Sequence, residues 1–424
     1  MTDRRPTSNW AGNQAYRSTR LLTPRTVDEV QAMVAASRRI RVLGSGHSFN
    51  ALADTTGDHL SLAGLPPTVE IDRAAATVTV SGGLRYGDVA GRLERAGLAL
   101  ANLASLPHIS IAGACATGTH GSGETLGGLG TSVAGLHIVR ADGSLEVVDG
   151  RTDPDVLDAN VVALGLLGVV TAVRLRLEPS FRIRQQVFDD VGFDAVLRAF
   201  DDVAGAAYSV SLFTDWRQQT FQVWLKHRVG DDGGPPLPRS LLGVRPASGP
   251  RHPVPGIDPT NCTVQRGVAG PWHLRLPHFR MGFTPSAGEE LQSEYFVGRE
   301  QAVAALRALE PLRARIAPLL LISEVRFVAA DRLWLSPAYD RSSTAIHFTW
   351  KPDWPAVRDL LPQIEAALAP FEPRPHWGKL FTIDGRVLRT RFTRLAAFAE
   401  LAAAADPSGK FRNGFTDALV FGRS

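Results

Sequence analysis

Cysteine is nearly absent from the chain, and this scarcity narrows the class of protein. The 424 residues include only two cysteines, Cys115 and Cys262. Two cysteines provide neither a disulfide framework nor a zinc cluster. We therefore expect a protein of a reducing compartment, the cytoplasm, with no bound metal.

Long apolar segments are also missing. Residues 1–10, MTDRRPTSNW, contain no apolar stretch of the kind that a secretory signal needs. The longest nearly apolar run, residues 161–173, is shorter than the roughly 20 residues that a membrane helix requires. We expect this run to lie in the core and the protein to have no membrane partner.

Lysine is scarce as well, and arginine supplies most of the positive charge. The net charge of +4 could suit a nucleic-acid binder. The basic residues are scattered, however, without runs of Lys or Arg and without interleaved aromatic residues. We expect no nucleic-acid partner. The lysines are Lys226, Lys351, Lys379 and Lys410.

The remaining composition is that of a globular protein with a large core. Hydrophobic residues make up 44% of the chain, and its length suits two domains of about 100–200 residues each. A capping box at Thr26–Glu29 and a turn at Asp142-Gly143 are local signals for a helix start and a hairpin. The patterns predict helices over 27–39, 85–96 and 395–405, strands over 40–43, 77–81 and 173–177, and a hairpin of 133–140 with 145–148.

Two long stretches show little periodicity. Residues 101–128 are rich in Gly, Ala, Ser and Thr, and we expect an extended loop lying on a ligand. Residues 230–259 are rich in Gly and Pro. We expect a long surface loop there, which could close over a site as a lid.

The glycine-rich segments do not match the common nucleotide-binding motifs. GSGHSF, residues 44–49, has Phe49 where a dinucleotide fingerprint needs its third glycine, and SGK at 408–410 lacks the first glycine of a P-loop. Backbone N–H groups in tight turns can still bind a pyrophosphate. Ordinary tight loops remain the alternative. Two such loops, each with an embedded histidine, favour a phosphate-bearing cofactor.

Four strings carry a family resemblance. They are RVLGSGHSFN (41–50), NLASLPHISIAGACATGTHGSG (102–123), RPHWGK (374–379) and DPSGKF (406–411). Together they resemble the vanillyl-alcohol-oxidase superfamily of flavoproteins, and most closely its alditol oxidases, the xylitol and sorbitol oxidases. The resemblance covers nearly the whole chain.

The resemblance implies an α+β fold in two parts. Residues 1–180 would form the first part of an FAD-binding domain of the PCMH type, and residues 379–424 would return to it. An α+β substrate domain, residues 181–378, would be inserted between them. FAD would be bound covalently, through the 8α-methyl group of its isoalloxazine ring, to His47. Cys115 matches a position that is merely small in the family, and we expect a buried side chain there.

The resemblance also assigns the residues that would contact the cofactor. His120 and His376 would lie against the flavin or its phosphates, although His120 fits equally well as a buried structural histidine. The full set is Arg41, Val42, Leu43, Gly44, Ser45, Gly46, His47, Ser48, Ser105, Ser110, Gly113, Thr117, Gly118, Thr119, His120, Gly168, Val170 and His376.

Two predicted strands, residues 321–327 and 344–350, each carry a pair of polar residues two positions apart. Because alternate residues of a strand share a face, Glu324 and Arg326 point the same way, and so do His347 and Thr349. The pattern alone fits two amphipathic strands with wet outer faces as well as a pocket. The resemblance assigns a polyol pocket to Ser105, Glu324, Arg326, His347, Thr349 and Lys379.

This pocket suggests a mechanism. Hydride transfer from C1 of a polyol to the flavin N5 would be accompanied by loss of the hydroxyl proton. Arg326 and Lys379 would stabilise the developing alkoxide and the anionic reduced flavin. His347, the third candidate catalytic residue, could accept the hydroxyl proton. Small Ala104, beside Ser105, would leave a path for oxygen.

The expected function is therefore oxidation of an alditol by O2, with a monomeric protein as the catalyst. The nearest alternative is a sugar-lactone oxidase or dehydrogenase of the same superfamily, which shares the flavin loops. A non-catalytic flavin-binding protein is the second alternative, but it would not need the polar pocket.

Overall fold

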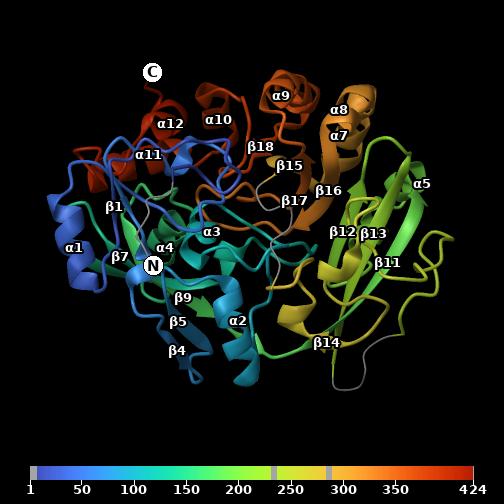
Figure 1. The fold of residues 1–424 in the computed structure, drawn as a ribbon, viewed down its shortest axis with the longest axis horizontal. Coiled ribbons are helices and arrows are strands. Elements are labelled where there is room, and N and C mark those ends of the chain that lie inside the picture. Colours follow the sequence, from blue (N-terminus) through green and yellow to red (C-terminus); the bar gives the residue numbers. More distant parts are fainter. Residues whose placement is uncertain (1–6, 231–235, 283–288, 424) are drawn as a thin grey trace.

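A computed structural model describes residues 7–230, 236–282 and 289–423 (Figure 1). Helices and sheets are mixed along the chain, which confirms the α+β class. Two larger sheets and two smaller ones are present in the described residues. None of the helices described combines the length and apolarity needed to cross a membrane.

The five-stranded sheet lies in the first half of the chain and is antiparallel. The predicted hairpin is confirmed as its β7–β8 pair. Val173 and Leu175 are fully buried, whereas the alternating Arg174 is partly exposed. The strands in order are β4 (Val69–Asp72), β5 (Thr77–Ser81), β9 (Val169–Arg176), β7 (Val133–Val139) and β8 (Leu145–Asp149).

A small parallel sheet joins the N-terminal segment to the first glycine loop. Its order is β1 (Arg20–Leu22), β3 (Asp58–Leu60) and β2 (Ile40–Val42). Helix α1 (Val27–Ala36) begins where predicted, with the Thr26 hydroxyl accepting from Glu29 N at 3.1 Å. It ends three residues before the predicted end, because the backbone of Ser37 is extended.

Residues 101–128 differ from the expected extended loop. They contain a short helix, α3 (Ile111–Ala116), whose residues Ile111, Ala114 and Cys115 are buried. The small residues that argued against a long helix allow this single turn-and-a-half to pack closely against its surroundings. The elements around it are α2 (Tyr86–Arg95), α4 (Pro154–Val161), and the two-stranded pair β6 (Leu98–Ala99) and β10 (Glu178–Pro179).

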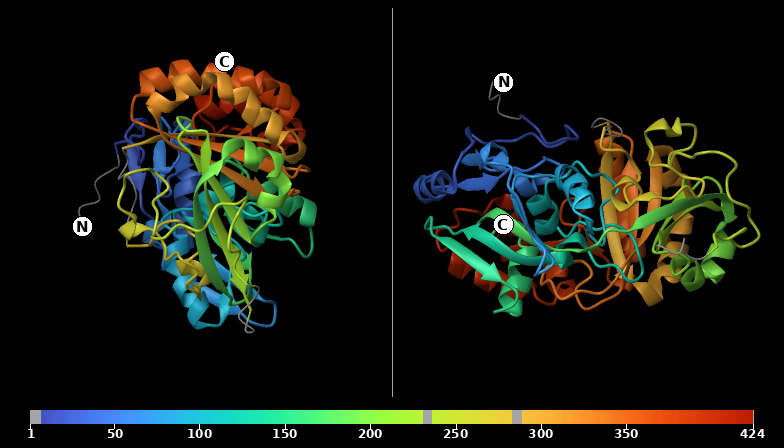
Figure 2. Two further views of the ribbon diagram at one scale, coloured as in Figure 1. Left: turned by 90° about the vertical axis from the view of Figure 1, so that its right-hand side faces the viewer. Right: turned by 90° about the horizontal axis from the view of Figure 1, so that it is seen from below.

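The largest sheet has eight strands, and its paired strands are antiparallel. Helices cover one of its faces: α7 packs on β15, α8 on β16, and α9 against α7 (Figures 1 and 2). The strands in order are β14 (Gly270–Pro271), β11 (Arg182–Gly192), β13 (Thr220–Val229), β12 (Ser209–Thr214), β16 (Leu320–Val328), β17 (Ser343–Trp350), β15 (Leu291–Gly298) and β18 (Arg374–Pro375). The helices are α5 (Phe193–Arg198), α6 (Phe200–Ala204), α7 (Ala302–Leu309), α8 (Arg313–Leu319) and α9 (Trp354–Leu368).

The C-terminal segment returns to the N-terminal part of the chain, so that the red and blue ends of the ribbon lie together (Figure 1). The Asn413 amide donates to the carbonyl oxygens of Ala51, Leu52 and Asp54 at 3.0, 3.1 and 2.7 Å. These bonds tie the end of the chain to the first glycine loop. The helices here are α10 (Gly385–Arg391), α11 (Leu395–Ala405), which confirms the prediction, and α12 (Gly414–Thr416).

The Gly- and Pro-rich loop contains no helix or strand over residues 236–258, as expected. Residues 231–235 of the predicted loop lie outside the described residues. His252, Pro253, Val254 and Ile257 line the cavity that holds the candidate site.

Candidate active site

One cavity of about 770 Å³ collects the residues that the sequence singled out. It lies between the glycine segments and the face of the eight-stranded sheet opposite helices α7 and α9, and is of a size usual for ligand sites. Every predicted cofactor and substrate residue lines it except Gly118. Gly118 instead takes a positive φ of +71°, and a Cβ there would lie 3.0 Å from Pro337 Cδ.

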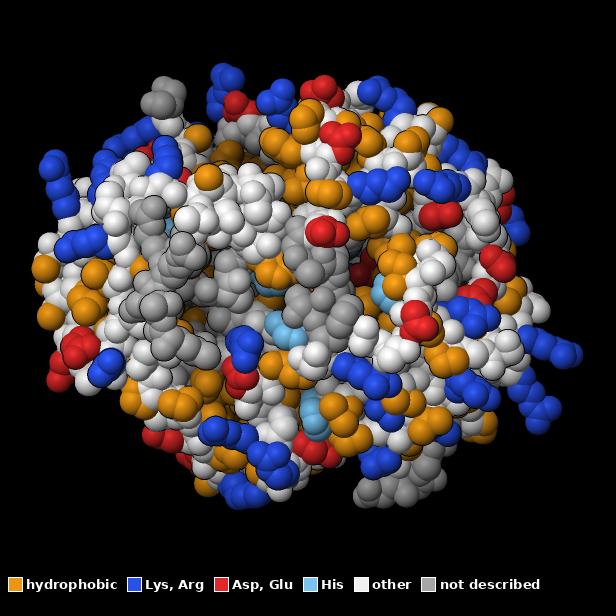
Figure 3. Space-filling view, in the orientation of Figure 1, with side chains coloured by type: hydrophobic (Ala, Val, Ile, Leu, Met, Phe, Trp, Pro, Cys, Tyr) orange, Lys and Arg blue, Asp and Glu red, His pale blue; other side chains and the backbone are white. Residues whose placement is uncertain are grey.

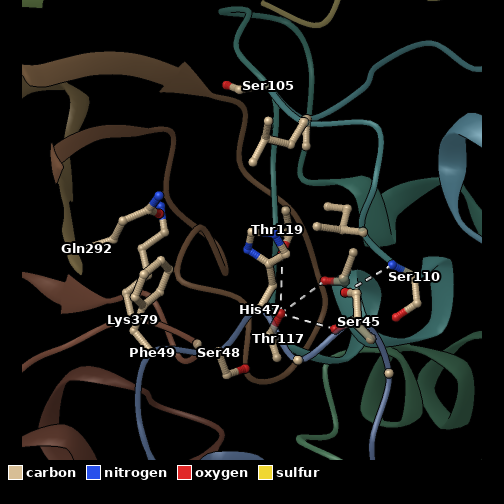
Figure 4. Close-up of a pocket in the computed structure, with 18 of the residues that line it drawn as sticks. Ser45, His47, Ser48, Phe49, Ser105, Ser110, Thr117, Thr119, Gln292 and Lys379 are labelled. Carbon is tan, nitrogen blue, oxygen red and sulfur yellow. Dashed lines mark hydrogen bonds between the residues drawn. The ribbon is translucent and has the colours of Figure 1, made fainter. Parts of the chain in front are cut away.

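The two glycine segments meet on one side of this cavity. A Cβ on Gly44 would lie 2.5 Å from the Ser110 hydroxyl oxygen, so glycine lets the two segments approach without displacing this hydroxyl. In Figure 4, Lys379 and Gln292 lie on one side of His47, with Ser45 and Ser110 on the other.

The donor set on this side fits an anionic group. Residues 42–48 and 104–119 contain no Asp or Glu, whereas hydroxyl groups of these segments line the cavity. A pyrophosphate would therefore meet donors and no carboxylate from either segment. The hydroxyl residues are Ser45, Ser48, Ser105, Ser110, Thr117 and Thr119.

Arg41 lines the cavity, but its guanidinium holds the surrounding chain. It donates to the carbonyl oxygens of Leu52, Leu164 and Phe411 at 2.5, 2.9 and 2.7 Å. Burial lowers the pKa of Arg41 to about 10. This side chain joins two segments of the cavity wall, at Leu52 and Leu164, to the C-terminal segment at Phe411.

His47 is held as a neutral ring. It stacks on Trp10 with ring centroids 4.3 Å apart. Burial lowers its pKa to about 4, and the nearby His108 and Lys379 add to the effect. A neutral imidazole has a free lone pair, which is the state that a nucleophilic nitrogen needs. The residue thus fits a bond to the cofactor.

The opposite wall is a set of side chains in register on three strands. Glu294 of β15 pairs with His347 of β17, which pairs with Glu324 of β16. Directly opposite residues point to the same face of a sheet. Gln292, Thr349 and Ile322 form the next row.

Glu294, which the sequence analysis did not single out, is the centre of this wall. Its side chain is fully buried, with Oε2 2.7 Å from Lys379 Nζ and Oε1 2.7 Å from Arg326 Nη2. His120 Nε2 lies 3.3 Å from Oε1. Burial alone would raise the pKa of Glu294, but Lys379 and Arg326 outweigh it and hold this pKa well below its ordinary value.

His347 has a partner at each ring nitrogen. Lys379 Nζ lies 2.9 Å from Nδ1, and the Thr349 hydroxyl lies 2.9 Å from Nε2. Burial and the charge of Lys379 lower the pKa of His347 well below its ordinary value. With Lys379 donating to Nδ1, the ring hydrogen lies on Nε2 and is donated to Thr349.

Glu324 and Arg326 also lie in the cavity wall, with a third residue behind them. His278 Nε2 is 3.0 Å from Glu324 Oε1, while Arg326 Nε is 3.6 Å from Oε2. Burial would raise the pKa of Glu324, but Arg326 and His278 lower it below its ordinary value. The backbone N–H of His278 donates to Ser105 O at 3.2 Å, which links the two walls.

The sequence analysis missed Gln292, Glu294 and His278, and the sequence contains a signal for the first two only. Gln292 and Glu294 are a polar pair two positions apart in the strand LQSEYFVG, the same spacing that marked the other two strands. That signal could have found them. His278 lies in a loop, where no periodicity applies.

The comparisons with known proteins agree with this arrangement. Residues 19–149 match the family described as "FAD binding domain", and residues 288–419 match "D-arabinono-1,4-lactone oxidase". An alditol oxidase of Streptomyces sp. (strain IKD472 / FERM P-14339) is 48% identical over 423 residues, which cover 98% of this chain and 99% of the relative. This chain belongs to the alditol oxidase family.

Two other relatives are less similar to this chain in sequence. An L-gulono-1,4-lactone dehydrogenase of Mycobacterium tuberculosis (strain ATCC 25618 / H37Rv) is 27% identical, covering 96% of this chain and 97% of the relative. An L-gulonolactone oxidase of Mus musculus is 24% identical, covering 97% and 98%. All three relatives extend over nearly the whole chain.

A solved structure shares the fold of this alditol oxidase family member. A cholesterol oxidase from B. sterolicum superposes with a TM-score of 0.77 at 17% identity, covering 97% of this chain and 96% of the other. Together the comparisons show an FAD-dependent oxidoreductase of the vanillyl-alcohol-oxidase superfamily that acts with oxygen.

Proposed function

We propose that this enzyme oxidises the terminal primary alcohol of an alditol, such as xylitol or sorbitol, to the aldehyde. The alcohol loses two electrons and two protons, and O2 gains both to become H2O2. FAD, held by the two glycine segments, would supply the two-electron redox chemistry that connects the alcohol to oxygen. The observation that carries the proposal is the gathering of Glu324, Arg326, His347, Thr349 and Lys379 in one cavity with the glycine segments.

A polyol suits this cavity because each of its hydroxyls both donates and accepts. A buried polar group without a partner costs about 1–3 kcal/mol, so such a substrate needs a wall of polar groups. The wall offers carboxylate oxygens of Glu324, the hydroxyl of Thr349, and the cationic donors of Arg326 and Lys379. We assign Ser105, which also lines the cavity, to the same substrate site.

We assign the developing negative charge on the C1 oxygen to Lys379 and Arg326. Both are held in place by Glu294, so their positive charges are fixed before the substrate binds. We keep His347 as the candidate acceptor of the hydroxyl proton, with Lys379 beside its Nδ1 and Thr349 beside its Nε2 in the described protein. Donors that are fixed before the reaction stabilise charge without reorganisation.

The deciding experiment is peroxide release in air from xylitol, sorbitol, glycerol, glucose and gulono-lactone. We expect peroxide from xylitol or sorbitol and little from the lactone. Activity on the lactone alone would instead support the second candidate, a sugar-lactone oxidase, which the match of residues 288–419 to the lactone-oxidase family favours. Activity only with an artificial acceptor would indicate a dehydrogenase.

We further propose that His47 is joined covalently to FAD. The neutral, stacked ring and its place in the cavity support this bond. Acid-precipitated protein is expected to be yellow, and His47→Ala protein is expected to release its flavin under the same treatment. White wild-type precipitate with free FAD in the supernatant would rule the bond out.

We also propose the division into an FAD-binding domain (1–180 with 379–424) and a substrate domain (181–378). It is supported by the five-stranded sheet within 69–176 and the eight-stranded sheet within 182–375.

The free cysteines Cys115 and Cys262 suit a cytoplasmic protein. On the face shown in Figure 3, basic side chains are scattered among acidic ones rather than gathered in one patch. We propose a monomer, which light scattering after gel filtration would test.

A further inference from the structure

A chain of hydrogen bonds leads from a buried lysine to one oxygen of Glu324. Lys226 lies on β13 and exposes 1% of its surface. Its Nζ donates to the carbonyl oxygens of Leu276 and Pro277, the latter at 3.3 Å, and lies 3.3 Å from His278 Nδ1. The other ring nitrogen of His278 is 3.0 Å from Glu324 Oε1. The chain therefore ends on a carboxylate that lines the cavity.

Burial lowers the pKa of Lys226 to about 7. Below this pH the side chain is an ammonium, and its chemistry fixes the direction of each bond. An ammonium group has three N–H donors and no acceptor, and Nζ of Lys226 faces three acceptors. His278 Nδ1 must then accept, which leaves the ring hydrogen on Nε2. That nitrogen donates to Glu324 Oε1, and the Ser211 hydroxyl lies farther away at 3.5 Å. Lys226 thus sets the tautomer of His278.

The second oxygen of Glu324 is left for another partner. Among the described residues, Oε2 accepts no hydrogen bond, and Arg326 Nε, 3.6 Å away, is a buried donor without a partner. A group that donates to Oε2 and accepts from Nε would satisfy both atoms. An alcohol hydroxyl does this, because it carries one donor and two lone pairs.

We propose that Lys226 is a positioning residue that acts through His278 to hold Glu324 Oε1, so that Oε2 and Arg326 Nε bind one hydroxyl of the substrate. This inference rests on the proposed alditol substrate and adds residues from β13 and the 276–278 loop to its site. Without the bond from His278, the Glu324 carboxylate could rotate until Oε2 accepts directly from Arg326 Nε, and neither atom would then be left for the substrate hydroxyl.

A purely structural role for Lys226 would make different predictions, and the chain offers a matched control. Lys410 is also buried, and its Nζ donates to the carbonyl oxygens of Val34, Ala35 and Ala141 at 2.6, 3.3 and 2.7 Å. It does not line the cavity. Replacing either lysine by methionine removes an ammonium that donates to backbone carbonyl oxygens, but only Lys226 is connected to Glu324.

The kinetic test compares Lys226→Met with Lys410→Met in the holoenzyme with xylitol as substrate. We expect Lys226→Met to raise KM about tenfold, the loss typical of a hydrogen bond to a charged group, with a smaller change in kcat. Lys410→Met should keep the wild-type KM, whatever its thermal stability. Equal KM values in the two variants would overturn the proposal.

Two substitutions of His278 refine the test. His278→Gln keeps an N–H donor for Glu324 and should retain a KM near that of the wild type. His278→Phe removes the donor while keeping a ring, and should raise KM as Lys226→Met does. If the Gln and Phe variants behave alike, the donated hydrogen is not what holds Glu324.

A spectroscopic readout separates this proposal from the proposed function. In holoenzyme with ¹⁵N-labelled histidine and no substrate, NMR should show His278 with its hydrogen on Nε2, and Lys226→Met should lose this preference. The His278→Gln variant identifies the signal. A wild-type hydrogen on Nδ1 would overturn the inference even if alditols are oxidised. If alditols are not oxidised but the Nε2 hydrogen is found, the proposed substrate fails and the role of Lys226 stands.

Discussion

Glu294 Oε2 and Lys379 Nζ lie 2.7 Å apart in the wall of the cavity, although 85 positions separate the two residues in the chain. The same carboxylate binds Arg326 through Oε1, also at 2.7 Å. One buried anion therefore sets the spacing of the two cations to which we assign the charge on the substrate oxygen. Charge-assisted bonds of this kind are short and directional.

Glu294→Gln should shift the pH dependence of the reaction. Burial lowers the pKa of Lys379, and the charge of Glu294 opposes this effect. Removing that charge lowers the pKa of Lys379 further, so the ammonium form is lost at a lower pH. The alkaline limb of kcat/KM for xylitol is expected to move to lower pH.

Two variants control this measurement. Glu294→Asp keeps the charge and should leave the limb near its wild-type position. Glu310→Gln removes a carboxylate that pairs with Arg307 away from the cavity, and should change nothing. An alkaline limb that stays in place in Glu294→Gln would show that Lys379 does not depend on Glu294.

Arg326→Lys should slow flavin reduction while keeping the positive charge. The planar guanidinium of Arg326 binds Glu294 through Nη2 and still offers Nε to the substrate. A lysine side chain has one nitrogen and cannot do both. We expect the rate of anaerobic flavin reduction by xylitol to fall by about 100-fold, as when one preorganised donor to an oxyanion is lost. The exposed Arg332, which pairs with Asp155, provides the control Arg332→Lys. Wild-type reduction by Arg326→Lys would remove Arg326 from the catalytic residues.

Ala104 should govern the reaction of the reduced flavin with oxygen. It lines the cavity beside Ser105 and is 7% exposed. Ala104→Val should slow reoxidation because its extra methyl groups narrow the approach, and Ala104→Gly should not. Stopped-flow mixing of reduced enzyme with oxygenated buffer measures the rate, with the reductive half-reaction as the internal control. Equal reoxidation rates in both variants would contradict the assignment.

Thermal stability should fall as the pH is lowered from about 6.5 toward 4, the interval between the ordinary pKa of histidine and the folded-state pKa of His278. Burial lowers the pKa of His278 to about 4, and lowers those of His347 and His376 well below the ordinary value. In this interval the unfolded chain binds more protons than the folded one, so acid favours unfolding.

Melting curves at pH 7.5, 6.0 and 5.0 would measure this effect. His278→Gln, which cannot titrate, should lose less stability over the same interval than the wild type. A melting temperature that rises toward pH 5.0 would mean that these rings are protonated in the folded protein.

Much of the fold could be predicted because its signals are local. The strands around Glu324 and His347 carry polar residues at alternate positions over short stretches, and the structure confirms both as β16 and β17. The helix over 395–405 has its predicted bounds. The short helix α3 was missed because small residues carry no clear period. The domain boundaries and the roles of the site residues stay predictions.

The sequence by itself determined the local structure, the glycine segments with His47, and the polar pairs on two strands, because these depend on neighbours within a few residues. Only the tertiary structure decided that Glu294 joins Arg326 to Lys379 and that Lys226 reaches Glu324 through His278. Those contacts depend on strand order and register in the eight-stranded sheet and on the path of the 276–278 loop. Such long-range pairings are set by the packing of the whole core, which no short stretch of sequence specifies.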